Sequence, residues 1–82
     1  MSKGNSVIVY GKYGHELNYI ESIADNIVFL KNPVCLARDY YVKDVSVDYC
    51  FTMDGEPLYP SEYQDDIPKP SKETIESLLK SI

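Results

Sequence analysis

The most regular pattern in the chain is an alternation of apolar and polar residues that ends just before Asp54-Gly55. Apolar side chains stand at every second position of this stretch: Val45, Val47, Tyr49, Phe51 and Met53. Side chains two residues apart in a strand lie on the same face of a sheet. The pattern therefore predicts a strand over residues 45–53 with one buried face.

Asp54-Gly55 predicts the turn that follows this strand. A two-residue type I′ hairpin needs positive φ at both central residues, and Asp-Gly is among the preferred pairs. In that register Phe51 lies opposite Leu58 and Met53 lies opposite Glu56. We therefore expect a tight hairpin with one apolar face that another element must cover.

Short runs of β-branched and aromatic residues predict more strands in the N-terminal half. Ser6–Tyr10 precedes two closely spaced glycines, which indicates a strand and then a turn. Ile27–Lys31 is a continuous apolar run, and we expect Asn32-Pro33 to end it because proline interrupts a strand. Two further short candidates are Val34–Ala37 and Tyr40–Val42.

Two segments have a second interpretation. The apolar side chains of residues 15–26 follow at intervals of three and four, which favours a helix. No capping residue precedes His15, so a strand remains open as well. Around Asn32 the alternative is a helix capped by that residue with Pro33 in its first turn. We prefer strands there because the residues that follow are β formers.

The C-terminal third has a different pattern. Residues 59–70 hold three prolines, which fix an extended path and remove backbone donors, so we expect a strap across the surface. Ser71 then fits the N-cap of a helix over residues 71–82, with Glu73 in its first turn. Its apolar face comprises Ile75, Leu78, Leu79 and Ile82. A helix this short must pack that face against the sheet or another subunit.

These elements predict one β-rich α+β domain over residues 1–82. The β-rich core covers residues 6–58, the Pro-rich strap covers 59–70, and the C-terminal helix covers 71–82. A chain of this length buries only about 60% of its unfolded surface, so self-association is a natural way to add burial. We therefore expect a homo-oligomer.

Charge is distributed unevenly along the chain, whose net charge is −5. Residues 1–43 carry five basic and four acidic side chains, whereas the remainder carries three basic and nine acidic ones. An acidic half repels the phosphate backbone that dominates nucleic-acid affinity, which argues against duplex nucleic acid as a partner. No apolar run approaches the ~18 residues of a membrane span, and the first residues do not resemble a signal peptide. We expect a cytoplasmic protein with no membrane partner.

Residues that usually carry catalysis or bind metals are sparse. His15 is the single histidine, and no cysteine or carboxylate stands at the spacing that a metal site or a hydrolase triad requires. Cys35 and Cys50 stand fifteen residues apart outside any paired motif, so we expect two buried free thiols. The sequence therefore predicts no enzyme activity, no cofactor and no metal.

The order of elements over residues 6–53 carries a family resemblance. A glycine-punctuated first strand and a polar second segment precede the turn at residues 24–26, and a strand then ends at 30–33 before the apolar residues 34–36. This order resembles the small bent β-barrels of the Sm-like type found in short bacterial and phage proteins. The resemblance implies a strongly bent antiparallel sheet or barrel that assembles into rings through its edge strands. It implies no RNA binding, because the Arg-Gly signature of the Sm site is missing.

Binding is the function class that remains. We predict that an oligomer holds a small anionic ligand such as a nucleotide in pockets, with basic side chains for phosphates and tyrosines for stacking on a base. The candidate ligand-binding residues are Lys12, Tyr13, His15, Arg38, Tyr40 and Tyr41. Some small phage proteins neutralise bacterial defence by sequestering a signal nucleotide, and the size and acidity of this chain fit that anti-defence role.

The alternative function is an acidic inhibitor that blocks a basic, nucleic-acid-binding host protein. Tyrosine suits protein interfaces because it covers a large area with few rotatable bonds and has a polar tip. The candidate protein-binding residues lie on the Pro-rich strap: Tyr59, Glu62, Tyr63, Asp65 and Asp66. A structural accessory subunit is a third class.

Overall fold

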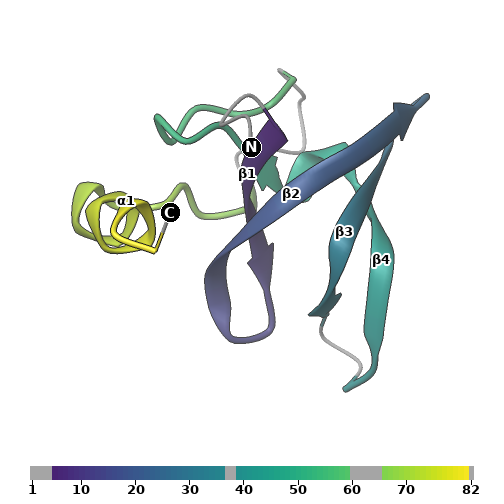
Figure 1. Ribbon diagram of the computed structural model, residues 1–82, viewed down its shortest axis with the longest axis horizontal. Coiled ribbons are helices and arrows are strands. Elements are labelled where there is room, and N and C mark those ends of the chain that lie inside the picture. Colours follow the sequence, from purple (N-terminus) through teal and green to yellow (C-terminus); the bar gives the residue numbers. More distant parts are fainter. Residues whose placement is uncertain (1–4, 37–38, 60–65, 82) are drawn as a thin grey trace.

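The computed structural model describes residues 5–36, 39–59 and 66–81 (Figure 1). Its strands form one antiparallel sheet in the order β4-β3-β2-β1-β5. The strands are β1 (Ser6–Gly11), β2 (Gly14–Ala24), β3 (Ile27–Cys35), β4 (Tyr41–Ser46) and β5 (Cys50–Phe51). The 3₁₀ turn η2 (Val47–Tyr49) joins the last two strands, and the helix α1 (Lys72–Leu79) follows near the C-terminus.

The sheet is strongly curled into a half-barrel because the long strand β2 changes partner along its length (Figure 1). Its first half, to Tyr19, pairs with β1, and its second half, from Ile20, pairs with β3. The ladder with β3 shifts register between Ile20 and Ser22, where a β-bulge adds twist and bend. The predicted β-rich fold with a strongly bent sheet and a C-terminal helix is therefore confirmed.

The curl brings the end of β1 against the end of β3, although these strands are not neighbours in the sheet. The backbone N–H of Lys12 donates to the Cys35 carbonyl over 2.8 Å. A Cβ on Gly11 would lie 2.8 Å from the same carbonyl oxygen and 3.0 Å from a methyl of Val34. Glycine permits this close approach because it has no side chain to collide with the neighbouring strand.

The main hydrophobic core lies inside the curl. Its buried residues come from β1, β3, β4, η2 and β5: Val7, Val9, Val28, Leu30, Val34, Val45, Val47 and Cys50. Complete burial of an aliphatic side chain stabilises a fold by roughly 1.5–3 kcal/mol. This cluster is therefore the main source of stability in the curled sheet.

Asn18 of β2 is a buried polar residue, 2% exposed, and it bridges two diverging strands. Its Nδ2 donates to the Asn32 carbonyl over 2.9 Å, and its Oδ1 accepts the backbone N–H groups of Asn32 and Tyr19 over 3.2 and 2.8 Å. Backbone pairing between β2 and β3 begins only at Ile20 and Leu30. The side-chain amide thus replaces ladder bonds where the two strands separate.

Residues near the C-terminus contact β2 and the loop after β5, and α1 lies on that side of the sheet (Figure 1). Ile8 of β1 is fully buried. His15 Nε2 donates to the Pro68 carbonyl over 2.7 Å, and a Cβ on Gly55 would lie 2.7 Å from Cδ1 of Ile75. These contacts attach the strap and the helix to the sheet, yet no described side chain of α1 is buried.

The predicted continuous strand over residues 45–53 is wrong. The strand β4 ends at Ser46, whose hydroxyl accepts the backbone N–H of Asp48 over 3.3 Å and caps the turn η2. The turn changes which side chains face inward, so Cys50 is buried while Tyr49 is 36% exposed. Alternation cannot reveal this change, because the apolar residues Tyr49, Phe51 and Met53 continue the pattern past the turn.

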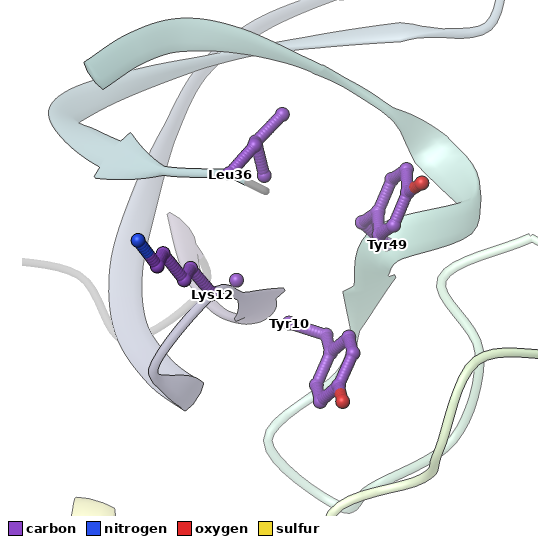
Figure 2. A pocket seen from close by; sticks show the side chains of 5 residues that line it. Tyr10, Lys12, Leu36 and Tyr49 are labelled. Carbon is purple, nitrogen blue, oxygen red and sulfur yellow. The ribbon is translucent and has the colours of Figure 1, made fainter. Parts of the chain in front are cut away.

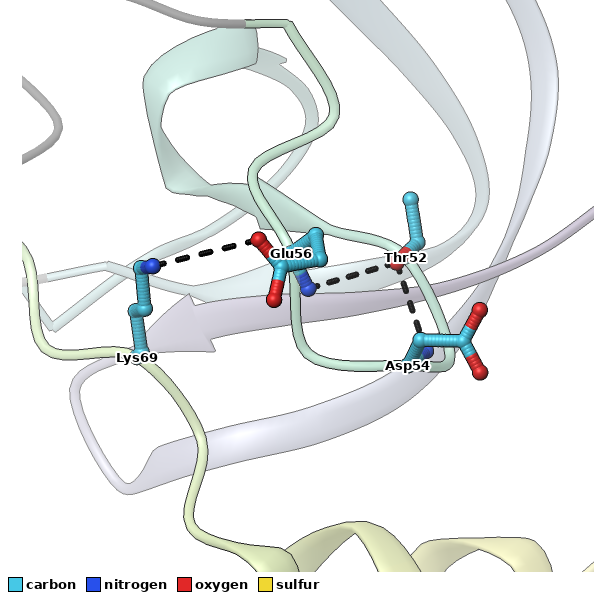
Figure 3. Close-up of polar contacts among 4 residues, drawn as sticks. All are labelled: Thr52, Asp54, Glu56 and Lys69. Carbon is cyan, nitrogen blue, oxygen red and sulfur yellow. Dashed lines mark hydrogen bonds and ion pairs between the residues drawn. The ribbon is translucent and has the colours of Figure 1, made fainter.

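The turn after β5 also differs from the predicted type I′ hairpin (Figure 3). Gly55 has a positive φ of 87°, whereas Asp54 does not. The Gly55 N–H donates to the Thr52 carbonyl over 2.9 Å, and the Thr52 N–H donates to the Glu56 carbonyl over 2.7 Å. The loop therefore has three residues with glycine last, and Glu56 lies opposite Thr52 instead of Met53. The Thr52 hydroxyl supports it by accepting the N–H groups of Asp54 and Glu56, each over 3.3 Å.

The longer loop shifts the register of the hairpin by one residue. Phe51 forms a bridge with Pro57 instead of Leu58. The loop is also linked to the strap, because Lys69 Nζ lies 3.9 Å from the Glu56 carboxylate (Figure 3). Both groups are well exposed, so this ion pair adds little to stability.

The ambiguous segment over residues 15–26 forms most of β2 and the turn that follows it. Its backbone pairs with a strand on each side, and such tertiary pairing overrides a helical spacing of apolar residues. The turn begins at Asp25, which has a positive φ of 57°. Aspartate is one of the residues that adopt this conformation at modest cost.

The expectation that Asn32-Pro33 ends a strand is wrong, because β3 continues to Cys35. No register pair involves Pro33 on either side, since pairing with β4 is interrupted between Phe29 and Val34. The missing N–H of proline therefore costs no ladder bond at this position.

The C-terminal helix is confirmed. Ser71 is the N-cap of α1, and its hydroxyl accepts the Thr74 N–H over 3.1 Å. Half of the predicted strap, residues 60–65, lies outside the described residues, and residues 66–70 lead directly to the N-cap of the helix. Neither α1 nor any other described helical segment has the length and apolarity to cross a membrane.

Candidate functional site

A cavity of about 310 Å³ opens between the end of β1, the residue after β3 and the turn η2 (Figure 2). Its lining residues are Tyr10, Gly11, Lys12, Leu36 and Tyr49. Lys12 lies on one side of the space and the two tyrosine rings lie on the other. The curl of the sheet creates this cavity, because it brings together residues from three separate parts of the chain.

The two tyrosines are positioned by different elements. The ring of Tyr10 lies 4.8 Å, centroid to centroid, from the ring of His15, its partner across the β1–β2 hairpin. His15 is itself held by the Pro68 carbonyl and by an edge contact of 5.9 Å with Phe51. Tyr49 ends η2 and is 36% exposed. The ring of Tyr10 therefore has a fixed support, and both rings can offer flat apolar surfaces to a ligand.

Lys12 is the one cation among the residues that line the cavity. Its backbone is anchored to Cys35, and its ammonium pairs with the carboxylate of Asp39. The ammonium also lies 5.6 Å from the ring centre of Tyr13, within range of a cation–π contact. The side chains of Lys12 and Asp39 are 36% and 72% exposed, so the pair is in contact with solvent.

The structure brings together only part of the predicted ligand site. Lys12 lines the cavity, and Tyr13 lies beside its ammonium. His15 does not line the cavity, because its imidazole faces the strap. Tyr40 and Tyr41 are 57% and 64% exposed and are not among the lining residues. Arg38 lies outside the described residues.

Three lining side chains were absent from the predicted site: Tyr10, Leu36 and Tyr49. The sequence could have indicated Tyr10 as a site residue, because it directly precedes Gly11 and the candidate Lys12. No such signal existed for Tyr49, because its alternating position predicted a buried strand residue. Its place at the cavity depends on η2, which the sequence pattern conceals.

The predicted protein-binding residues are less fully described. Tyr59 is 50% exposed and Asp66 is exposed. Glu62, Tyr63 and Asp65 lie outside the described residues. Binding of a basic protein through the acidic strap therefore stays a prediction.

The two cysteines are free and buried. Burial raises the pKa of the Cys50 thiol from its usual 9.0 to about 12, because the thiolate would lose its hydration. Cys35 is 2% exposed. Thiols become nucleophiles as thiolates, so Cys50 behaves as a small apolar core residue at neutral pH. Among the described residues, no three His, Cys, Asp or Glu side chains gather as metal ligands would.

Comparisons of the chain with protein-family models, with curated proteins and with solved structures found no match. The strands define a strongly curled antiparallel half-barrel with a C-terminal helix.

Proposed function

We propose that this protein is a non-catalytic binding protein for a small anionic ligand with a planar ring, of the nucleotide class. The observation that supports this is one cavity with the Lys12 ammonium on one side and the rings of Tyr10 and Tyr49 on the other (Figure 2). An ammonium attracts a phosphate group, and aromatic side chains provide stacking surfaces for any base. Leu36 adds an apolar wall that removes water from the ring of the ligand.

The size of the cavity limits the ligand. Ligand pockets in proteins span about 300–1,000 Å³. At about 310 Å³ this cavity is at the lower end of that range. It therefore suits one mononucleotide, linear or cyclic, better than a longer oligonucleotide.

The proposal includes a homo-oligomer that associates through edge strands, as Sm-like rings do. The outer edge of β4 is unpaired within the described sheet. Next to it, the side chains of Ile27 and Phe29 on β3 are 37% and 38% exposed, which leaves apolar surface for a second copy to cover. An oligomer would multiply the pockets and suit a phage protein that sequesters a signal nucleotide from the defence of its host.

Calorimetric titration with linear and cyclic mononucleotides tests the pocket. We expect measurable binding by the wild type, and at least a tenfold loss of affinity in Tyr49→Ala and in Lys12→Met, because each removes one of the two kinds of contact. Tyr41→Ala is the matched control, since Tyr41 is exposed but does not line the cavity. An equal loss in Tyr41→Ala, or no binding of any mononucleotide, contradicts the proposal.

Mass measurement in native buffer tests the assembly separately. We expect an oligomer that Phe29→Lys dissociates, because a charge there opposes burial of the exposed β3 face. A monomeric wild type excludes the assembly but does not contradict the proposed ligand pocket.

A second candidate function is the acidic inhibitor of a basic host protein. The observation that favours it is the exposure of Tyr59 and Asp66, two of the predicted protein-binding residues that the structure describes. Pull-down from bacterial lysate with Tyr59→Ala and with Lys12→Met distinguishes the two candidates. Capture of a basic protein that is lost in Tyr59→Ala but kept in Lys12→Met favours the inhibitor, whereas no specific capture by a wild type that binds a mononucleotide favours the pocket.

A further inference from the structure

The cation of the cavity already has an anion bound to it. The Lys12 ammonium pairs with the carboxylate of Asp39, from the connection between β3 and β4. Asp39 has a positive φ of 65°, a conformation that only a few non-glycine residues tolerate. The carboxylate is therefore the partner of Lys12 that an anionic group of a ligand would have to replace.

We propose that Asp39 is an internal competitor for Lys12, and that the ligand of the pocket replaces its carboxylate with a doubly charged phosphate group. This inference rests on the proposed function, because it concerns the same cavity. A ligand can shift an equilibrium only by its difference in affinity for the two states. Here the two states are Lys12 paired with Asp39 and Lys12 free to receive the ligand.

The competition makes the charge of the ligand decisive. A carboxylate ligand only exchanges one singly charged partner of Lys12 for another. A phosphate monoester carries about −1.5 to −2 charges at pH 7 and gains more from the same ammonium. A neutral nucleoside gains nothing from Lys12 and keeps only its contacts with the tyrosine rings. The pocket therefore favours a nucleoside monophosphate over the corresponding carboxylate and the bare nucleoside.

The exposure of the pair makes the exchange feasible. Because Asp39 is 72% exposed, its carboxylate regains most of its hydration when it leaves Lys12. Exposed ion pairs contribute about 0.2–1 kcal/mol, which corresponds to a competition factor of up to about fivefold. Asp39 thus weakens the binding of anions by a measurable factor without preventing it.

The experiment uses Asp39→Asn, which removes the charge and retains a residue that tolerates positive φ. Adenosine 5′-monophosphate, adenosine 5′-carboxylate and adenosine are titrated into the wild type and the variant. We expect Asp39→Asn to bind both anions about three- to fivefold more tightly, by the same factor for each, and to bind adenosine unchanged. The gain should shrink as salt is added, because the pair is exposed to solvent.

Two controls separate competition from a general change of charge. Asp44→Asn makes the same change in net charge at an exposed position of β4 and should alter affinity less than twofold. In a Lys12→Met background, Asp39→Asn should give no gain, because the cation for which Asp39 competes is missing.

The outcomes distinguish this inference from the proposed function. If the wild type binds the monophosphate through Tyr49 but Asp39→Asn and Asp44→Asn behave alike, the competitor is disproved and the pocket stands. If Asp39→Asn raises the affinity for adenosine as much as the affinity for the anions, the competitor is likewise disproved and the pocket stands. If no variant binds the monophosphate, both proposals fail.

Discussion

The curled sheet and the C-terminal helix are stabilised in different ways. The sheet encloses a cluster of fully buried aliphatic side chains, and β1 is buried on both of its faces. The helix α1 has no buried side chain, and Leu79 on its apolar face is 42% exposed. Its attachment relies on a few contacts, among them the close approach of Ile75 to Gly55. We infer that the sheet folds as the stable unit and that the helix opens at lower free energy.

The largest expected effect comes from the interior of the curl. Leu30→Ala should lower the free energy of unfolding by about 3 kcal/mol, because it removes a 1% exposed side chain and leaves a cavity. Leu79→Ala on the helix should cost less than about 1 kcal/mol. Urea unfolding of both variants measures the difference. Equal losses would show that the helix belongs to the same cooperative core.

The next effect tests whether a polar residue holds the curl together. Asn18→Leu removes the bonds to both backbone groups of Asn32 at a partly buried position, which should cost about 2 kcal/mol. Asn26→Leu changes an exposed side chain of the same type and should cost less than about 0.5 kcal/mol. If the two variants have equal urea midpoints, the side chain of Asn18 is dispensable.

A smaller effect depends on pH. The pKa of Cys50 is raised to about 12 in the folded protein by burial, so the thiol stays protonated while the unfolded chain loses this proton above about pH 9. The stabilisation is complete below pH 9 and declines as pH rises toward 12. At pH 10 the wild type should have lost about 1.4 kcal/mol more than Cys50→Ala, relative to pH 7. If the free energy of unfolding of the two proteins changes equally with pH, the pKa of Cys50 is not raised by burial.

The smallest expected effect is local to the helix. Ser71→Ala removes the hydroxyl that accepts the Thr74 N–H and should destabilise α1 by about 1 kcal/mol. Because the sheet is the stable unit, hydrogen exchange should accelerate over residues 72–79 with little change in Leu30 or its neighbours. Ser77→Ala, at an exposed position inside the helix, is the control and should not accelerate exchange. Faster exchange throughout β1–β3 would show that sheet and helix open together.

Local signals predicted part of the fold well. The β-branched run at Ser6–Tyr10 forms β1, and Ser71 caps the C-terminal helix, because each signal depends on residues close in sequence. The alternation over residues 45–53 predicted one strand where η2 interrupts two. In this stretch the Ser46 cap and the burial of Val47 and Cys50 in the core override the alternating pattern.

The candidate site was predicted less completely than the fold. Lys12 was recognised as a candidate because it is one of the basic side chains of the first half of the chain, and it lines the cavity. Tyr10 and Tyr49 were missed because their meeting depends on the curl of the sheet, which spacing along the chain does not report. Exposed tyrosines such as Tyr41 were chosen instead, since sequence alone does not separate one tyrosine from another.

The sequence by itself determined that this protein is β-rich, acidic in its second half and closed by an amphipathic helix, because periodicity, charge and capping are local properties. The tertiary structure decided which side chains share a cavity. β2 changes partner after Tyr19, and Gly11 lets β1 approach β3, so the sheet curls until Lys12, Tyr10 and Tyr49 line one cavity. That juxtaposition arises from contacts between residues distant in the chain, which no local pattern encodes.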